Sequence, residues 1–446
     1  MSHDDTPLSK AQEDMLSFHD DVGSCAWFAP PGFGKTRAYL QNAYDTGDRT
    51  LVLAPKLVCM DTWPRENKKW GYKLPMRFLH GPQKHLRGPE LVSVINPEAA
   101  PWIFGKMLES RKPIFKTVVL DELSMWKNPT AKRVLSWVGE LEKGKVGARV
   151  KTDYVIGGTG TPVGAHLKDL FGEMLCVDGG RSLGTDHEKF LRQHFHHDKY
   201  TQRLEPYHDS EQKILDAISH RAISFDINDL GLDKPMHIPH YLELPPAARQ
   251  AYEEMHEHNV VEELELYAAN AAVKSSKLRQ LTGGGVIDLH GGRKYLHDAK
   301  ADHLASILAE NDGRPTLVFF EFQSDYETIC RVLKRDVPVL YGRTSQRDAK
   351  RWLKDWNAGR LPVFALHPRS AAYGLNLQDA GNHIVFYTLP WSFEMVNQGI
   401  ARLWRQGQKK TVVVHYLMVE NTKDEDVYER VAEREETHYR VMEALL

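Results

Sequence analysis

Short runs of mostly apolar residues alternate with longer amphipathic stretches in the first third of the chain. Strands that are apolar on both faces are typical of parallel sheets, because helices cover each side of such a sheet. The alternation therefore predicts an α/β region built around a parallel sheet. The expected strands are Ser24–Phe28, Thr50–Pro55, Leu91–Ile95, Lys116–Leu120 and the beginning of Asp153–Pro162.

The same alternation returns in the C-terminal part of the chain. It predicts a second parallel sheet with its own covering helices. The expected strands are Pro315–Phe320, Val337–Tyr341, Leu361–Leu366 and His383–Tyr387, and the expected helices include Ser345–Asn357 and Phe393–Trp404.

The middle of the chain has a different pattern. Strand-like runs become scarce, and helical patterns such as Ala247–Lys277 dominate. The glycines of Thr282–Gly285 and Gly291–Gly292 have the composition of a flexible hinge. We therefore expect two α/β lobes with parallel sheets, separated by a mainly helical insertion. The expected boundaries are residues 1–175 for the first lobe, 176–300 for the insertion and linker, and 301–446 for the second lobe.

Length and composition indicate a globular protein of more than one domain. A chain of 446 residues is too long for one ordinary hydrophobic core. No apolar run approaches the roughly 20 residues of a membrane span. The first residues, Met1–Asp5, do not resemble a secretion signal, and the four cysteines lie far apart, so we expect a cytoplasmic protein. The formal net charge of −2 neither requires nor excludes a nucleic-acid partner.

The segment Ala29–Thr36, with the sequence APPGFGKT, has the pattern of a phosphate-binding loop. It follows an expected strand and precedes an expected helix, Thr36–Tyr44, which is the context that this motif requires. A Gly/Pro turn before an amphipathic helix is the alternative interpretation of the segment taken alone. The context favours the binding of phosphates.

Individual positions of this loop predict how a nucleotide is held. Gly32 and Gly34 allow the backbone N–H groups to face the phosphates. Lys35 is expected to reach the β- and γ-phosphates, and the Thr36 hydroxyl is expected to hold Mg²⁺.

Two acidic residues, Asp121 and Glu122, directly follow an expected buried strand. Ligands of open α/β sheets bind at the carboxyl ends of the strands, where this pair lies. We expect Asp121 to hold Mg²⁺ and Glu122 to orient and deprotonate the attacking water. A solvated turn is the alternative for any Asp-Glu pair, but the preceding phosphate-loop pattern argues against it.

Other candidates have less specific patterns. Gln12, on the expected helix Pro7–His19, has an amide that could pair with adenine or be solvated. Thr159 and Thr161 could relay a conformational signal or cap the next helix. Arg402 and Arg405 suit charge on a transferred phosphoryl group, or a surface ion-pair cluster.

Taken together, these motifs resemble those of the Swi/Snf branch of superfamily-two helicase-like ATPases. The resemblance covers nearly the whole chain. It rests on five blocks beyond the phosphate loop: Leu51–Lys56 followed by Trp63–Trp70, Asp121–Asn128, Gly158–Pro162, Gly374–Leu377 and Gln398–Gln408.

The resemblance implies two RecA-like lobes that bind ATP with Mg²⁺ and act, as a monomer, on DNA, in particular duplex DNA. It implies that Gln12 contacts adenine and that Arg402 and Arg405 act as arginine fingers across the cleft. Coupling between DNA contact and lobe closure is expected at Thr159, Thr161, Gly374, Asn376 and Gln398, and DNA phosphate contacts are expected at Lys56, Arg279, Arg343 and Arg369.

Some positions depart from the family pattern. Ser124 stands where the family has His, and Ala29–Gly32 replaces the acidic opening of the phosphate loop. Both departures bear on coupling rather than on ATP hydrolysis. The short insertion and the lack of a visible appendage resemble compact bacterial or phage members, for which nucleosome sliding is not expected and host cytoplasm is the expected site.

The motifs are compatible with three functions. The first is an ATP-dependent translocase on double-stranded DNA that remodels DNA or displaces bound proteins. The second is a strand-separating DNA or RNA helicase, which would share the ATP site. The third is a non-catalytic nucleic-acid clamp, against which the intact Lys35, Asp121, Glu122, Arg402 and Arg405 argue.

Overall fold

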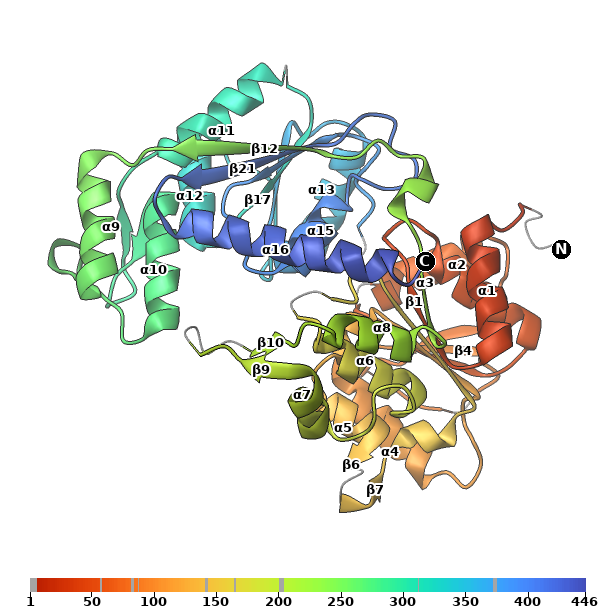
Figure 1. The fold of residues 1–446 in the computed structure, drawn as a ribbon. Coiled ribbons are helices and arrows are strands. Elements are labelled where there is room, and N and C mark those ends of the chain that lie inside the picture. The colour runs from red at the N-terminus through yellow and green to blue at the C-terminus, as the bar shows by residue number, and fades with distance from the viewer. Residues whose placement is uncertain are drawn as a thin grey trace. The chain divides into compact units, whose positions relative to one another are not determined.

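The protein forms two compact units, each built around one parallel sheet. The computed structural model describes residues 6–56, 58–81, 84–86, 88–140, 143–163, 166–199, 204–311, 313–371 and 375–446. Unit 1 comprises residues 1–230 and 434–446, and unit 2 comprises residues 231–433 (Figure 1). The two parallel sheets confirm the predicted α/β fold class. The division into three domains stays a prediction.

The sheet of unit 1 has seven strands in the order β11-β1-β8-β5-β2-β4-β3, and every neighbouring pair is parallel. The carboxyl ends of all these strands therefore lie at one edge of the sheet, where ligands of such folds bind. The strands are β1 (Cys25–Phe28), β2 (Thr50–Leu53), β3 (Met76–Phe78), β4 (Val92–Ile95), β5 (Thr117–Asp121), β8 (Tyr154–Thr159) and β11 (Ala222–Ser224).

Helices and small hairpins surround this sheet. The helices are α1 (Lys10–Val22), α2 (Lys35–Thr46), α3 (Trp63–Lys69), α4 (Ala100–Glu109), α5 (Lys132–Val138), α6 (Asp169–Asp178), α7 (His187–His194) and α8 (Ser210–Ile218). The hairpin strands are β6 (Gly139–Glu140) with β7 (Lys145–Val146), and β9 (Phe195–His197) with β10 (Leu204–Pro206).

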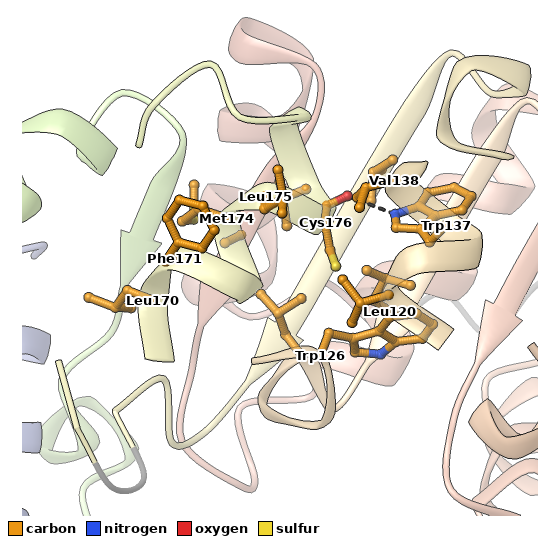
Figure 2. Packing of buried hydrophobic residues seen from close by; sticks show 14 of the residues in the cluster. Leu120, Trp126, Trp137, Val138, Leu170, Phe171, Met174, Leu175 and Cys176 are labelled. Carbon is orange, nitrogen blue, oxygen red and sulfur yellow. Dashed lines mark hydrogen bonds between the residues drawn. The ribbon is translucent and has the colours of Figure 1, made fainter. Parts of the chain in front are cut away.

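Each face of the sheet carries its own hydrophobic cluster. Successive residues of β1, Ala26 and Trp27, belong to different clusters, because side chains alternate between the two faces of a strand. Figure 2 shows the Ala26 side, where Trp126 and Trp137 are fully buried. The indole of Trp137 donates a hydrogen bond of 2.9 Å to the carbonyl of Cys176, which joins α5 to α6.

The sheet of unit 2 has six strands in the order β12-β21-β20-β17-β19-β18, and all neighbouring pairs are parallel. Val318, Phe319 and Phe320 are almost completely buried, as expected for a sheet covered on both faces. The strands are β12 (Met236–Leu242), β17 (Thr316–Phe319), β18 (Val339–Leu340), β19 (Val363–Leu366), β20 (His383–Phe386) and β21 (Val413–Val419).

Unit 2 also contains helices and hairpins. The helices are α9 (Pro246–His258), α10 (Ala271–Gly283), α11 (Ala299–Glu310), α12 (Gln323–Val332), α13 (Gln346–Asn357), α14 (Pro368–Ala371), α15 (Phe393–Ile400) and α16 (Lys423–Glu443), whose last residues belong to unit 1. The hairpins are β13 (Val260–Val261) with β14 (Leu266–Tyr267), and β15 (Gly285–Ile287) with β16 (Arg293–Tyr295).

The expected helical pattern over 247–277 is interrupted. Helix α9 ends because Asn259 adopts a left-handed backbone conformation with φ of 61°, and the β13–β14 hairpin separates it from α10. Figure 1 shows α9 and α10 as separate helices.

The expectation of a hinge at Thr282–Gly285 is wrong. These residues form the buried end of α10 and the start of β15. The glycines allow close packing, because a Cβ added to Gly283 would lie 2.4 Å from Oδ1 of Asp325.

Four strands of the two large sheets were not predicted, namely β3, β11, β12 and β21, and neither were the short hairpin strands. Strand β12 has the sequence MHIPHYL and alternates between exposed and half-buried positions. Pro239 within it is tolerated because β12 is an edge strand, parallel to β21 (Figure 1). The stretch 176–300 therefore contributes β11 to the sheet of unit 1 and β12 to the sheet of unit 2, besides its helices.

Among the described residues, no helix is long and apolar enough to cross a membrane.

Candidate nucleotide-binding site

The loop Ala29–Thr36 joins the carboxyl end of β1 to the N-terminus of α2. Gly32 and Gly34 have φ of 99° and 80°. Residues with a side chain rarely adopt such positive angles, so glycine is needed at both positions. The N-terminus of α2, which begins at Lys35, presents backbone N–H groups to this loop. A helix N-terminus that follows a glycine-rich loop is a site for anions.

The side chain of Lys35 folds over the loop. Its ammonium group donates to the carbonyl of Ala29, and a longer contact of 3.5 Å reaches the carbonyl of Pro30. A Cβ added to Gly158, at the end of β8, would lie 3.2 Å from Cδ of Lys35. The cation is therefore held between the loop and the carboxyl edge of the sheet.

Gln12 contacts the phosphate loop directly. Its Nε2 donates to the carbonyl of Gly34 at 3.2 Å, and its Oε1 accepts from the backbone N–H of Ser9 at 3.0 Å. The hydroxyl of Ser9 in turn caps the N-terminus of α1 by accepting from the backbone of Gln12. The buried amide of Gln12 is thus oriented by both its own helix and the loop.

Arg37 holds the segment before α1 against α2. Its guanidinium donates to the carbonyl of Pro7 at 3.1 Å and to the carbonyl of Thr6. It also lies over the ring of Trp70, 3.8 Å from the ring centroid. Arg37 was not predicted as a site residue, because the phosphate-loop motif ends one residue before it.

Asp121, the last residue of β5, is held by an aromatic residue of α3. The indole N–H of Trp63 donates to Oδ2 of Asp121 at 3.0 Å. Trp63 stacks on Tyr39, with 5.9 Å between ring centroids, and Tyr39 stacks on Trp27 at 4.9 Å. Burial raises the pKa of Asp121 above its usual value, while the Trp63 hydrogen bond and the positive charge of Lys35 oppose that rise.

The buried Tyr39 hydroxyl lies near this acidic pair. Burial raises its pKa, and the charges of Asp121 and Glu122 add to the rise. Neither Trp63 nor Tyr39 was selected from the sequence as a site residue. The Trp63–Trp70 block was a signal for the first of them, but its contact with a residue 58 positions away was not predictable from spacing.

Glu122 has a backbone conformation that is unusual for a non-glycine residue, with φ of 80°. Its N–H donates to the carbonyl of Gly158 at 2.9 Å. Its Oε1 accepts from the hydroxyl of Thr159 at 3.0 Å and from the hydroxyl of Ser124 at 3.1 Å. Conformations of this kind concentrate at functional sites, where the surrounding contacts maintain them.

Ser124, the departure from the family pattern, therefore contacts the predicted general base. Thr159 links the same carboxylate to the next segment, because its Oγ1 also accepts from the backbone N–H of Thr161 at 3.1 Å. The hydroxyl of Thr161 is buried and has no hydrogen-bond partner among the described residues.

The residues present fit a bound Mg²⁺ ion. Such an ion prefers carboxylate and hydroxyl oxygens. Oδ2 of Asp121 accepts from Trp63, and Oδ1 accepts no hydrogen bond from the part of the chain that the structure describes. Thr36, which the sequence predicts to hold this ion through its hydroxyl, lies in the first turn of α2.

Arg402 and Arg405 of unit 2 converge on one carbonyl. The guanidinium of Arg402 lies 3.4 Å from the carbonyl oxygen of Leu375, and that of Arg405 lies 3.3 Å from it. The Nε of Arg402 also donates to the carbonyl of Gln398 at 2.9 Å. Helix α15 ends at Ile400, earlier than the expected Trp404, so turns rather than a helix face carry both arginines.

Two other predicted coupling residues, Gln398 and Asn376, belong to the same unit as this pair. Gln398 is on α15, and its Nε2 lies 3.5 Å from Oε1 of Glu394. Asn376 is half-buried directly after Leu375. Gly374 lies outside the described residues.

Three of the four candidate DNA contacts are exposed: Lys56, Arg343 and Arg369. Lys56 follows β2, and the two arginines follow the neighbouring strands β18 and β19, so each lies beyond a carboxyl end. Arg279 is different. It is buried and donates to the carboxylate of Glu321 and to the carbonyl of Leu389, so contact with DNA would require this ion pair to open.

Comparisons with known proteins show what the chain is similar to. The family model described as "Helicase conserved C-terminal domain" matches residues 299–407. A phage protein named p41, of Acyrthosiphon pisum secondary endosymbiont phage 1, is 32% identical over 437 residues, which is 92% of each chain.

The ATP-dependent helicase/translocase YwqA of Bacillus subtilis is 22% identical over 94% of this chain. The match spans 47% of YwqA, so the chain corresponds to less than half of that relative. The SWI2/SNF2 ATPase core of Sulfolobus solfataricus, solved in complex with dsDNA, matches 98% of this chain and 93% of its own at 19% identity, with a TM-score of 0.43.

The chain combines two parallel sheets, a phosphate loop and Asp-Glu pair in unit 1, and the helicase C-terminal match. It is also 32% identical to a relative over 92% of each chain. The chain belongs to the Swi/Snf-type, superfamily-two helicase-like ATPases.

Proposed function

We propose that this ATPase is stimulated by DNA and moves along double-stranded DNA without separating its strands, so that it remodels DNA or displaces bound proteins. The observation that carries the proposal is the constellation of Lys35, Asp121 and Glu122 at one edge of the sheet in unit 1. This constellation has the parts needed for phosphoryl transfer to water.

Each residue of unit 1 has a separate task in this proposal. Lys35 and the N–H groups of the loop bind the phosphates of ATP, and Gln12 is placed beside the loop to contact adenine. Thr36 and Asp121 would hold Mg²⁺, which neutralises charge on the phosphate oxygens when it is bound. Glu122, fixed by Thr159 and Ser124, orients and deprotonates the attacking water.

Unit 2 supplies positive charge. Arg402 and Arg405 stabilise the negative charge that develops on the transferred phosphoryl group. Both guanidiniums contact Leu375, which belongs to the block expected to couple DNA contact to closure. Asn376, Gln398, Thr159 and Thr161 transmit that coupling in the proposed cycle.

The DNA contacts of the proposal are mostly contacts with phosphates. A motor that moves over any sequence cannot depend on base contacts, and phosphate contacts carry no sequence information. Lys56, Arg343 and Arg369 are exposed cations at the carboxyl ends of strands, as such contacts require. The name of the relative YwqA, a helicase/translocase, supports movement on nucleic acid.

The test is the rate of steady-state ATP hydrolysis without nucleic acid and with single-stranded DNA, duplex DNA or RNA. The Lys35→Ala variant serves as the blank, because it lacks the phosphate-binding ammonium group. Strong stimulation by duplex DNA is the expected result. Stimulation by single strands or RNA alone would instead favour the strand-separating helicase.

A second measurement separates translocation from unwinding. The protein should displace a third strand from triplex DNA in an ATP-dependent manner and leave a tailed duplex paired. ATP-dependent separation of the tailed duplex would contradict the proposal.

A further inference from the structure

Helix α13 has two chemically distinct faces. Trp356 is fully buried, and Trp352 packs against the hydrophobic cluster of unit 2. At about 100° per residue, Arg347, Lys350 and Lys354 lie within one narrow arc on the side away from Trp356. All three side chains are exposed. We call these three residues the outer face of α13.

The outer face carries charge of one sign. None of its three cations forms an ion pair with another residue of the described part of the chain. The acidic residues of the same helix are engaged elsewhere: Asp348 pairs with Arg351 at 3.1 Å, and Asp355 pairs with Arg360. The described residues therefore provide no ion pair that would neutralise the positive charge of this face.

Helix α16 has the charge distribution of an ordinary solvated helix surface. Its sequence, KDEDVYERVAEREETHYRVME, mixes acidic and basic residues along its length. Lys423 pairs with Asp426 at a spacing of three residues, and Arg440 pairs with Glu436 at 3.2 Å. A solvated face needs no uniform sign, so the arrangement on α13 indicates a partner with the opposite charge.

Helix α13 begins near the carboxyl edge of the unit 2 sheet, where the candidate DNA contacts Arg343 and Arg369 lie. Ser345 caps α13 by accepting from the backbone N–H of Asp348 at 3.1 Å, and Arg343 precedes this cap. Strand β18, which leads into α13, pairs with β19, and Arg369 follows β19. Arg347 therefore lies in the first turn of the helix, nearest to that edge, and Lys354 lies about 10 Å further along the axis.

We propose that the outer face of α13 binds the phosphate backbone of duplex DNA beyond the contacts made at the carboxyl ends of the strands. This inference rests on the proposed function and assigns a further contact surface to it. Duplex DNA is the occupant that the charge favours, because its phosphates give it a high density of negative charge. Contacts of this kind do not depend on the base sequence.

The experiment measures the affinity for a labelled duplex at several salt concentrations. The test variant is Arg347→Gln/Lys350→Gln/Lys354→Gln, since glutamine keeps helix propensity and removes charge. Each phosphate contact contributes about 0.9 to the slope of log K against log salt, so the slope should become shallower by about 2.7.

Two further variants are the controls. Arg314→Gln/Lys409→Gln/Lys410→Gln removes three exposed charges of unit 2 that precede β17 and β21, at the amino ends of the strands. Its salt slope should stay within about one unit of the wild-type slope. Arg347→Lys/Lys350→Arg/Lys354→Arg keeps the charge of the outer face and should keep the wild-type slope. Thermal unfolding shows whether each variant is folded.

The two proposals fail in different ways. If the wild-type protein neither binds duplex DNA nor hydrolyses ATP faster with it, the proposed function fails, and this inference fails with it. If the wild-type protein binds and the test variant keeps the wild-type slope, only the role of the outer face is wrong. That result would assign the face to solvent or to an acidic protein partner.

Discussion

The indole N–H of Trp63 donates a hydrogen bond to Oδ2 of Asp121, with 3.0 Å between the nitrogen and the oxygen. Trp63 begins α3, and Asp121 ends β5, so the bond joins a helix to the acidic pair at the edge of the sheet. A hydrogen bond to a charged group contributes about 1.5–3 kcal/mol. Trp63 therefore orients the carboxylate that is proposed to hold Mg²⁺.

Replacing Trp63 with Phe should weaken the use of Mg²⁺ while the fold is kept. Phenylalanine retains stacking on Tyr39 but cannot donate to Asp121. We expect the Mg²⁺ concentration that gives half-maximal ATP hydrolysis to rise about tenfold, which corresponds to 1.4 kcal/mol. Hydrolysis rates at increasing free Mg²⁺ measure this change.

Trp137→Phe is the matched control for that experiment. It also removes one buried indole hydrogen bond, of 2.9 Å to the carbonyl of Cys176 (Figure 2), but in a different hydrophobic cluster from the one that contains Trp63. It should lower thermal stability without changing the Mg²⁺ requirement. Equal Mg²⁺ requirements in both variants would contradict the role of Trp63.

Glu122→Gln should slow hydrolysis strongly and preserve nucleotide binding. The amide oxygen can still accept from Thr159, but the amide cannot take a proton from water. We expect kcat to fall by about 10²–10⁴-fold. Hydrolysis rates and the binding of a fluorescent ATP analogue measure the two effects. Normal hydrolysis by this variant would show that another group is the general base.

Thr159 supplies a graded test of the same carboxylate. Thr159→Val removes the hydroxyl that donates to Glu122 and should lower kcat by about tenfold, the value of one hydrogen bond to a charged group. Thr159→Ser keeps the hydroxyl and should restore most of the rate. If valine and serine have the same effect, packing rather than the hydrogen bond explains the loss.

Arg405→Ala should slow ATP hydrolysis strongly with little change in ATP affinity. An arginine that stabilises the transition state contributes about 10³-fold or more to kcat. Single-turnover hydrolysis and equilibrium nucleotide binding separate the two quantities. Arg360→Ala, which removes an exposed arginine paired with Asp355 in the same unit, is the control and should have the wild-type rate.

Acid should destabilise unit 2 through a chain of histidines. His415 lies 2.9 Å from His240, and His240 lies 2.8 Å from His303, between ring nitrogens. Burial lowers the pKa of His415 to about 4, and the neighbouring histidines, His240 foremost, add to this shift. The unfolded chain then binds more protons than the folded chain below pH 6.5, so stability falls as the pH falls from about 6.5 to about 4.

The substitution His415→Asn tests this account. Asparagine can still pair with His240 but never becomes charged. The free energy of unfolding, measured by denaturant titration across this pH range, should then depend less steeply on pH, by about one proton or 1.4 kcal/mol per pH unit. An unchanged slope would show that other groups cause the acid sensitivity.

Several features were predictable from the sequence because they depend on neighbouring residues. The phosphate loop is one, since the left-handed φ at Gly32 and Gly34 and the start of α2 at Lys35 follow from glycine and helix preferences. The parallel sheets are another, because strands buried on both faces must be apolar throughout. The position of Asp121 at the end of β5 follows from the same pattern.

Other features depended on the tertiary structure. The strand β12 was not predicted, because its polar sequence with Pro239 lacks the pattern of a buried strand. An edge strand tolerates such a sequence, since it needs neither two apolar faces nor a hydrogen bond from every backbone N–H group. The glycines at Gly283 and Gly284 have the composition of a hinge, yet they are buried because Asp325 and His297 approach them closely.

The sequence by itself determined the fold class, the phosphate loop and the acidic pair, because local spacing and backbone preference specify them. Only the tertiary structure decided what surrounds the acidic pair. Trp63 reaches Asp121 across 58 positions, and Thr159 reaches Glu122 across 37. Such contacts arise from the order of strands in the sheet and from the packing of α3 against it, which no local pattern specifies.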